Sequence, residues 1–252
     1  MKGWDAVSVV MIVLNEADRI GAALDSIPAG AERIVADGGS RDESVAVAQR
    51  HGAHVVQQDD GAIRTARGNF DVARDAAARR YAGRPWIFYL DADERISDEL
   101  AAEISARLDD PEPAAYDMPR INMYWGRPVR LLGEDRQIRL FRAGRGAYPG
   151  RELHEELAVT GPIAHLTGPL RHENVRCWKD IRRRLQRYVP LEAQGLARRP
   201  SRGEVARAFD RRFSYYYLTQ GAWRDGWRGL AISAVYALQH AHVLYEARKR
   251  HV

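Results

Sequence analysis

The first 90 residues alternate between short apolar segments and segments with helical periodicity. Residues 7–14 (VSVVMIVL) are apolar without a break and rich in β-branched residues, which is typical of a strand buried on both faces of a sheet. Apolar residues then recur at helical spacing from Ile20 to Ile27, and Pro28 ends the predicted helix. Further strands are predicted at 33–36, 54–57 and 86–90, with helices at about 40–52 and 69–81. This alternation predicts an α/β fold whose mostly parallel sheet is covered by helices on both faces.

The pattern changes after residue 110. Residues 120–172 favour short strands and long loops, and from about 176 the chain becomes helical again. We therefore predict two domains, a catalytic domain at 1–175 and a helical extension at 176–252. Within the extension, an apolar stripe runs from Trp223 to Leu238 at helical spacing, and we expect it to pack inside the protein.

Charge also separates the two regions. Residues 1–175 carry 22 basic and 28 acidic side chains, whereas 176–252 carry 17 and 6, a net charge of +11. A solvated helical face or contact with anionic material would both explain this excess. Because Arg182–Arg184 accompany a helix rich in tryptophan and tyrosine, we expect this arginine face to meet an anionic membrane surface. No nucleic-acid motif accompanies the charge, so nucleic acid is not an expected partner.

Polar residues follow three of the predicted strands. Asp91-Ala92-Asp93-Glu94 comes directly after 86–90, Asp37-Gly38-Gly39-Ser40 after 33–36, and Leu14-Asn15-Glu16 closes the first strand. Carboxylates suit Mg²⁺ or Mn²⁺, which also bind substrate phosphates. Each segment alone also fits a helix cap or an ordinary turn, and Ser40 and Glu43 have the spacing of a capping box. Because the carboxyl ends of parallel strands share one edge, we expect a common ligand site there.

Together these segments resemble the family 2 glycosyltransferases of GT-A fold. The resemblance covers about residues 5–175, and the segments RLFR (139–142) and LHEE (153–156) are similar to the branch that contains the lipopolysaccharide-core β-1,4-glucosyltransferases. The segment GAWRDGWRG (221–229) is similar to a helix of the same enzymes. The resemblance implies transfer of a hexose, glucose being the first candidate, from UDP to a glycan or lipid-linked acceptor such as lipopolysaccharide core, with Mg²⁺ or Mn²⁺ as cofactor.

The resemblance also implies roles for individual residues. Asp37 faces the uracil, Gly38 is a nucleotide-binding candidate beside it, and Asp91 and Asp93 contact ribose and metal, with Asp93 the more direct metal ligand. The remaining nucleotide-binding candidates are Leu14, Asn15, Glu16, Arg67, Asn69 and Ala92. The contiguous basic-plus-Asn pair of the family is interrupted here by Gly68, between Arg67 and Asn69.

The resemblance further implies inversion at the anomeric carbon, which requires one general base to deprotonate the acceptor hydroxyl. We assign it to Glu155, with Asp135 as the competing candidate because GED (133–135) is similar to the base motif of other family members. His154 and His172 are further candidates for metal or diphosphate contact.

Two other interpretations remain open at the sequence level: the same fold acting on a polyprenyl phosphate or a protein side chain, and a sugar-nucleotide-binding protein without turnover. The chain contains neither the G-x-S-x-G motif of many hydrolases nor a P-loop. A single cysteine, Cys177, excludes a disulfide framework and favours a reducing, cytoplasmic location, either free or on the inner face of the cell membrane.

Overall fold

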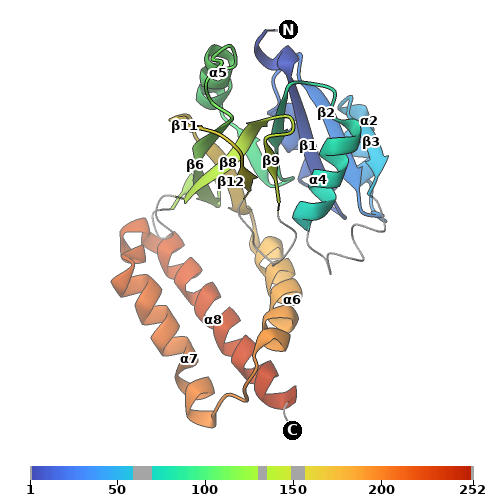
Figure 1. The fold of residues 1–252 in the computed structure, drawn as a ribbon. Helices are drawn as coiled ribbons and strands as arrows, with labels where there is room; N and C mark the ends of the chain where they lie inside the picture. Colours follow the sequence, from blue (N-terminus) through green and yellow to red (C-terminus); the bar gives the residue numbers. More distant parts are fainter. Residues whose placement is uncertain (1, 59–69, 130–134, 149–156, 251–252) are drawn as a thin grey trace. The chain divides into compact units, whose positions relative to one another are not determined.

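The computed structural model describes residues 2–58, 70–129, 135–148 and 157–250 (Figure 1). Its strands are β1 (Val7–Val13), β2 (Glu32–Asp37), β3 (His54–Gln57), β4 (Trp86–Tyr89), β5 (Glu94–Ile96), β6 (Ala115–Tyr124), β7 (Arg127–Pro128), β8 (Asp135–Arg142), β9 (Gly146–Ala147), β10 (Ala158–Val159), β11 (Ile163–His165) and β12 (Leu170–Val175). Its α-helices are α1 (Ile20–Asp25), α2 (Ser44–Arg50), α4 (Phe70–Tyr81), α5 (Asp98–Arg107), α6 (Trp178–Gly195), α7 (Arg202–Ser214) and α8 (Gly226–Arg250).

The main sheet has the strand order β3-β2-β1-β4-β8-β6-β12-β5, with β7 and β11 attached to β6. The strands β3, β2, β1 and β4 pair in parallel, as the alternating pattern predicts. Beyond β4 the sheet becomes largely antiparallel, beginning with the β4–β8 pair. The registers pair Val13 with Asp37 and Val10 with Tyr89, so β1, β2 and β4 end at the same edge of the sheet.

Both faces of the parallel strands are buried, which explains the uninterrupted apolar sequence of β1. Val7, Val9, Met11 and Val13 pack in a core that includes residues of α1, α2 and α5. Val10 belongs to a second core on the other face, together with residues of β2 and α4. Because helices cover both faces, the predicted α/β layer arrangement is confirmed.

The predicted capping box is wrong, because the helix α2 begins at Ser44 rather than after Ser40. The carboxylate of Asp42 accepts the backbone N–H of Ser44 (3.0 Å) at the start of this helix. The hydroxyl of Ser40 instead accepts the backbone N–H of Asn15 (2.9 Å), a residue on another strand end. The Ser40 side chain, which the local spacing assigned to a helix cap, therefore makes a long-range contact with Asn15 instead.

The chain forms two compact units. The first contains Met1–Arg120 and Asp135–His172, and the second contains Ile121–Glu134 and Glu173–Val252. The strands β6 and β12 continue from one unit into the other. The second unit thus includes residues around β7 that the sequence analysis placed in the catalytic domain.

In the second unit, α8 lies between α6 and α7 and packs against both (Figure 1). Ser201 and Glu204 form a capping box at the start of α7, with Ser201 Oγ accepting the Glu204 N–H (3.1 Å). The buried residues of this unit form two clusters, consisting of Tyr124, Val129, Val175, Ile181, Ala222 and Ile232, and of Val189, Ala193, Val243 and Ala247. Of the predicted apolar stripe, Val235 packs against the first cluster, whereas Trp223, Trp227, Leu230 and Leu238 are about half exposed.

Glycines shape the turn that leads into α8. Gly221 (φ 75°) and Gly226 (φ 59°) have left-handed φ values that favour glycine. A Cβ atom at Gly229 would lie 1.8 Å from the carbonyl oxygen of Ala222, so only glycine permits this close approach. These three positions explain the glycine spacing of the segment 221–229.

Candidate functional site

The first part of the site lies where β1 and β2 end. Asn15 has a left-handed backbone (φ 58°), and its side-chain Oδ1 accepts the N–H of Arg41 (2.8 Å). Its own N–H donates to Ser40 Oγ (2.9 Å). These two bonds fasten the end of β1 to the loop that follows β2, so the two predicted segments are adjacent in the structure.

Asp37 is buried at the end of β2, and its carboxylate is held by its own loop. It accepts the backbone N–H groups of Gly39 (2.9 Å) and Ser40 (3.0 Å). Gly39 has a φ of 91°, which allows the chain to turn back over the carboxylate. The backbone N–H of Gly38, directly after Asp37, donates to Val13 O (2.9 Å) and extends the β1–β2 pairing by one hydrogen bond. Asp37 is therefore fixed in orientation before any ligand arrives.

The second part of the site begins directly after β4. Asp91 Oδ1 accepts from Arg74 on α4, and Oδ2 accepts from Arg139 on β8 (2.8 Å). Partial burial alone would raise the pKa of the Asp91 carboxyl, but the positive charges of the two arginines outweigh this effect and lower it. Asp91 is thus an ionised carboxylate with both oxygens engaged.

Glu94 completes this buried ion cluster. Its side chain has no exposed surface, and Oε1 accepts from Arg139 (2.6 Å) and lies 3.7 Å from Arg120. Its other oxygen accepts the backbone N–H of Asp91 (3.0 Å). Arg139 reaches these groups because the Phe88–Leu140 pair of β4 and β8 places it beside the end of β4. The antiparallel strand β8 therefore provides the cation for two carboxylates of the DADE segment.

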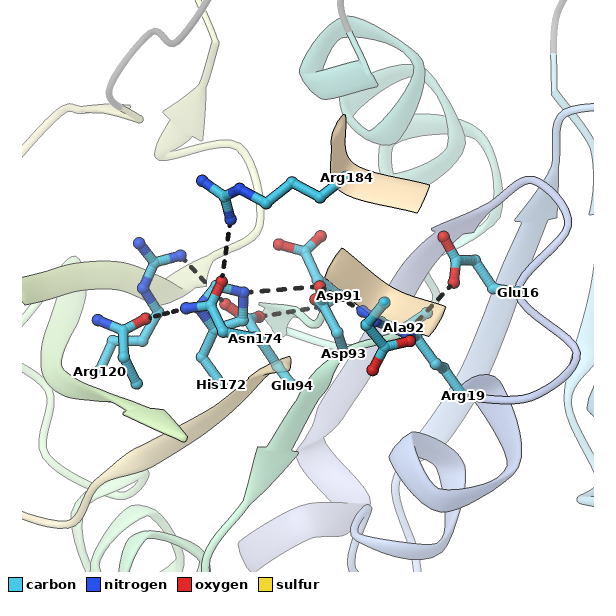
Figure 2. Close-up of polar contacts among 12 residues, drawn as sticks. Glu16, Arg19, Asp91, Ala92, Asp93, Glu94, Arg120, His172, Asn174 and Arg184 are labelled. Atoms are coloured by element: carbon cyan, nitrogen blue, oxygen red, sulfur yellow. Dashed lines mark hydrogen bonds and ion pairs between the residues drawn. The ribbon is translucent and has the colours of Figure 1, made fainter. Parts of the chain in front are cut away.

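Asp93 faces a different pair of basic side chains (Figure 2). Its Oδ2 lies 3.2 Å from Arg19 Nη1 and 3.5 Å from His172 Nε2. Burial would raise the pKa of Asp93, but the hydrogen bond and charge of His172 and the charge of Arg19 lower it overall. His172 arrives through the β12–β5 pairing, in which it lies opposite Glu94.

Arg19 also links the two parts of the site. Its Nε lies 4.0 Å from Glu16 Oε2, next to Asn15 at the end of β1, while its Nη1 contacts Asp93. Figure 2 shows Glu16, Arg19 and Asp93 in this order. Polar contacts therefore connect the segments that follow β1 and β4 at this edge, where the common ligand site is predicted.

Asp135, the competing candidate for the base, begins β8 and pairs with Arg120 on β6. Arg120 Nε donates to its Oδ2 (2.8 Å), and Gln137 donates to its Oδ1 (2.8 Å). Both oxygens already have a donor in this structure. Among the other candidates, Leu14 is exposed and Ala92 is buried, and Arg67, Asn69, His154 and Glu155 lie outside the described residues.

Sequence reasoning missed the arginines of the site. Arg19 directly precedes α1, and Arg74 lies on α4. Arg120 and Arg139 lie on β6 and β8. The available signal was Arg139 in the RLFR segment, because a charged residue between the apolar residues Ile138 and Leu140 needs a partner if it is buried. The planar guanidinium group also suits diphosphate oxygens, so this cluster fits an anionic ligand.

The acidic and histidine side chains of the site bear on metal binding. Among the residues that the structure describes, no three histidine, cysteine, aspartate or glutamate side chains are grouped to hold an ion. Asp93 and His172 are nevertheless adjacent, whereas Asp91 is engaged by arginines. The carboxylate of Asp93 fits Mn²⁺ or Mg²⁺ if phosphate oxygens and water complete the coordination, whereas the imidazole of His172 suits Mn²⁺ more than Mg²⁺.

Comparison with protein-family models decides the family. The model described as "Glycosyl transferase family 2" matches residues 8–160, which include every strand end described above. The chain belongs to glycosyltransferase family 2. It is therefore a glycosyltransferase that takes its sugar from a nucleotide donor, as the strand-end motifs predict.

Individual relatives agree with this assignment. The lipopolysaccharide core biosynthesis glycosyltransferase LpsC of Rhizobium meliloti is 26% identical over 95% of this chain and 92% of its own length. An uncharacterised glycosyltransferase of Rickettsia conorii is 34% identical over 54% of this chain and 44% of its own length. Among solved structures, TarS (residues 1–349) of S. aureus aligns with 98% of this chain and 89% of its own at 15% identity, with a TM-score of 0.51. The predicted GT-A fold is thereby confirmed.

Proposed function

We propose that this family 2 glycosyltransferase is an inverting, divalent-metal-dependent enzyme that transfers a hexose, glucose being the first candidate, from UDP to a glycan or lipid-linked acceptor such as lipopolysaccharide core. The observation that carries the proposal is the connected edge of the sheet, where Asp37 ends β2 and where Glu16 and Asp93 lie in the segments after β1 and β4. A nucleotide sugar needs this combination of a hydrogen-bond acceptor for the base and cations for the diphosphate.

The donor is bound, in this proposal, along the edge from β2 to β4. Asp37 accepts hydrogen bonds from the uracil, supported by the loop amides that fix its carboxylate. Asn15 and Glu16 lie beside the nucleoside, and Asp91 contacts the ribose. Further proposed contacts of the donor are Leu14, Gly38, Arg67, Asn69 and Ala92. The arginines that surround Asp91 and Asp93 then face the negative charge of the diphosphate.

Asp93 and His172 are the proposed protein ligands of Mn²⁺ or Mg²⁺, with His154 as a further candidate. When bound, the cation supplies stabilisation of the negative charge that develops on the departing diphosphate. An imidazole binds a metal ion in its neutral form through a ring nitrogen. The hydrogen bond and charge of His172, with the charge of Arg19, lower the pKa of Asp93 and favour its carboxylate form.

Glu155 is the proposed base that removes the proton of the acceptor hydroxyl, and Asp135 is the second candidate. A base needs a free lone pair directed at the acceptor. Asp135 accepts from Arg120 and Gln137 with its two oxygens, which favours Glu155. Glu155 and Asp135 therefore remain competing candidates for the base.

The acceptor assignment rests on similarity to LpsC over nearly the full length of both chains. A lipopolysaccharide-core acceptor is held in the inner leaflet, so we place the enzyme in the cytoplasm with peripheral contact to the cell membrane through its basic second unit. The described residues include no helix long and apolar enough to cross a bilayer. Polyprenyl phosphate or a protein side chain is the alternative acceptor.

A thermal-shift panel of UDP-, GDP- and dTDP-sugars with Mn²⁺ tests the donor, because a ligand that binds only the folded state raises its stability. Stabilisation by UDP-glucose is expected. If only GDP- or dTDP-sugars stabilise the protein, the uridine assignment is wrong.

Turnover is tested by release of UDP from UDP-glucose with lipopolysaccharide truncated in its core as acceptor. Release should require Mn²⁺ or Mg²⁺ and stop on addition of EDTA. Glu155→Gln should lower the rate by about 10²–10⁴-fold with little change in UDP affinity, whereas Asp135→Asn serves as the matched carboxylate control. The opposite result would transfer the base role to Asp135. Binding of UDP-glucose without any turnover on all acceptors would favour a non-catalytic binding protein.

A further inference from the structure

The helix α8 carries a continuous apolar stripe that the second unit leaves exposed. Trp227, Leu230, Leu238 and Tyr245 are each about half exposed (47–54%). Ala231, Ala234 and Ala241 fall between them at helical spacing and are partly exposed. From Trp227 to Tyr245 the stripe spans 18 residues, or about 27 Å of helix.

The other faces of α8 explain why this stripe is not simply part of a helical core. Ile232, Ala237, Val243 and Ala247 are buried where α8 packs against α6 and α7. Within the described part of the second unit, the helices therefore cover two sides of α8 and leave the stripe uncovered. Contiguous exposed apolar surface of this length marks an interaction site.

Aromatic rings with a cation above them lie at both ends of the stripe. At the amino-terminal end, Arg228 lies 4.6 Å from the centre of the Trp227 ring, and just before α8 the preceding pair, Arg224 and Trp223, lies at 4.8 Å. At the carboxyl-terminal end, Lys249 Nζ lies 4.4 Å from the ring centre of Tyr245. Tryptophan and tyrosine prefer the boundary between water and lipid, where long basic side chains extend to the headgroups.

The aromatic surface extends beyond α8 at its amino-terminal end. Trp125 lies 5.1 Å from Trp227 and 5.3 Å from Trp178, measured between ring centres. Trp178 is the most exposed of the three, at 64%. Because these rings come from the β6–β7 turn, α6 and α8, three separate elements of the second unit contribute to one aromatic cluster.

Charge identifies the occupant. Residues 176–252 have a net charge of +11, so a second copy that met the stripe with its own stripe would bring like charge against like charge. An anionic surface has the complementary sign and attracts each basic residue near it. The apolar stripe, its aromatic ends and the charge of the unit thus agree on a surface that is both apolar and anionic.

We propose that the α8 stripe, centred on Trp227, Leu230, Leu238 and Tyr245, is the surface by which the enzyme inserts into the interface of a bilayer containing acidic phospholipid. The helix lies in the plane of the interface with its apolar side toward the acyl chains, because it is not a membrane-crossing helix. This inference deepens the membrane contact of the proposed function and depends on it. It replaces the arginine face by the stripe as the inserting surface.

Co-sedimentation with vesicles tests the stripe directly. The full-length protein should bind vesicles of phosphatidylcholine with 30% phosphatidylglycerol and bind pure phosphatidylcholine much more weakly. In the double variant Leu230→Glu/Leu238→Glu, two exposed apolar side chains become charged, and binding should weaken by about tenfold for each leucine. Ile163→Glu is the matched control, since Ile163 is similarly exposed (42%) but lies on β11 in the first unit, and it should bind as the unsubstituted protein does.

Two results would overturn the inference. The first is equal vesicle binding by the double variant and the Ile163→Glu control, since the stripe would then not insert. The second is a dimer by light scattering that the double variant converts to a monomer, because the stripe would then join two copies of this chain. Thermal stabilisation by UDP-glucose, measured without lipid on the same variants, separates these outcomes from failure of the proposed catalytic function.

Discussion

Replacing Arg139 by methionine tests the buried ion cluster at the centre of the site. The guanidinium donates to Asp91 (2.8 Å) and to Glu94 (2.6 Å), and the Glu94 side chain has no exposed surface. Methionine keeps most of the volume and removes the charge, which leaves Glu94 with Arg120 at 3.7 Å as its remaining ion-pair partner among the contacts described. Removing one partner of a buried pair typically costs about 3–5 kcal/mol of unfolding free energy.

The assay is urea denaturation followed by circular dichroism, with UDP-glucose binding measured on the same samples. The control is Arg136→Met, which also removes an arginine from β8. Arg136 is 37% exposed and pairs with Asp117 (2.6 Å), and such surface pairs contribute about 0–1 kcal/mol. The Arg139 variant should therefore be destabilised by several kcal/mol more than the control.

The difference in unfolding free energy between the unsubstituted protein and the Arg139 variant should also depend on pH. The pKa of Asp91 is lowered in the folded state by Arg74 and Arg139 against the opposing effect of burial, so its contribution is complete above the ordinary carboxyl pKa of about 4. That contribution is lost as the pH falls through the lower, folded-state pKa. The difference between the unsubstituted protein and the Arg139 variant should thus shrink in acid. Equal destabilisation of both variants at pH 7, or a difference that grows in acid, would refute the reasoning.

Three further predictions concern the metal, the turn before α8 and the start of α7. Asp93→Asn and His172→Gln should each raise the Mn²⁺ concentration needed for half-maximal UDP release by at least about tenfold, measured by metal titration, and an unchanged titration would exclude them as ligands. Gly229→Ala should destabilise the second unit by about 1–3 kcal/mol in urea denaturation, since its Cβ would meet a backbone oxygen at 1.8 Å, and a neutral result would contradict this packing. Ser201→Ala should cost about 1 kcal/mol through loss of the α7 cap, whereas Ser201→Asp should restore most of it.

Local pattern was sufficient for the parallel half of the sheet. Runs of apolar residues predicted the three strands β1, β2 and β4, because burial on both faces of a sheet requires consecutive apolar positions. Asn15, Asp37 and Asp91 lie at the ends of these strands. Adjacent ends of parallel strands then follow from topology alone. The capping box at Ser40 failed because its hydroxyl binds a residue 25 positions away, a contact that local spacing does not contain.

The charge partners of the site could not be predicted in the same way. Arg139 and Asp91 are 48 residues apart, and their contact depends on the antiparallel register of β8 against β4. His172 approaches Asp93 only because β12 pairs with β5. Register between distant strands is a tertiary property, so the sequence indicated two carboxylates but not which cations neutralise them.

The amino-acid sequence by itself determined the order of strands and helices, the polar residues at the strand ends and the apolar stripe of α8, because each depends on near neighbours along the chain. Only the tertiary structure decided which face of α8 the protein covers. Periodicity gives the side of a helix on which apolar residues lie, whereas their burial depends on where other elements pack, and α6 and α7 pack elsewhere. Most large side chains of the stripe that predicted a core are therefore exposed, whereas Val235 packs against the buried cluster.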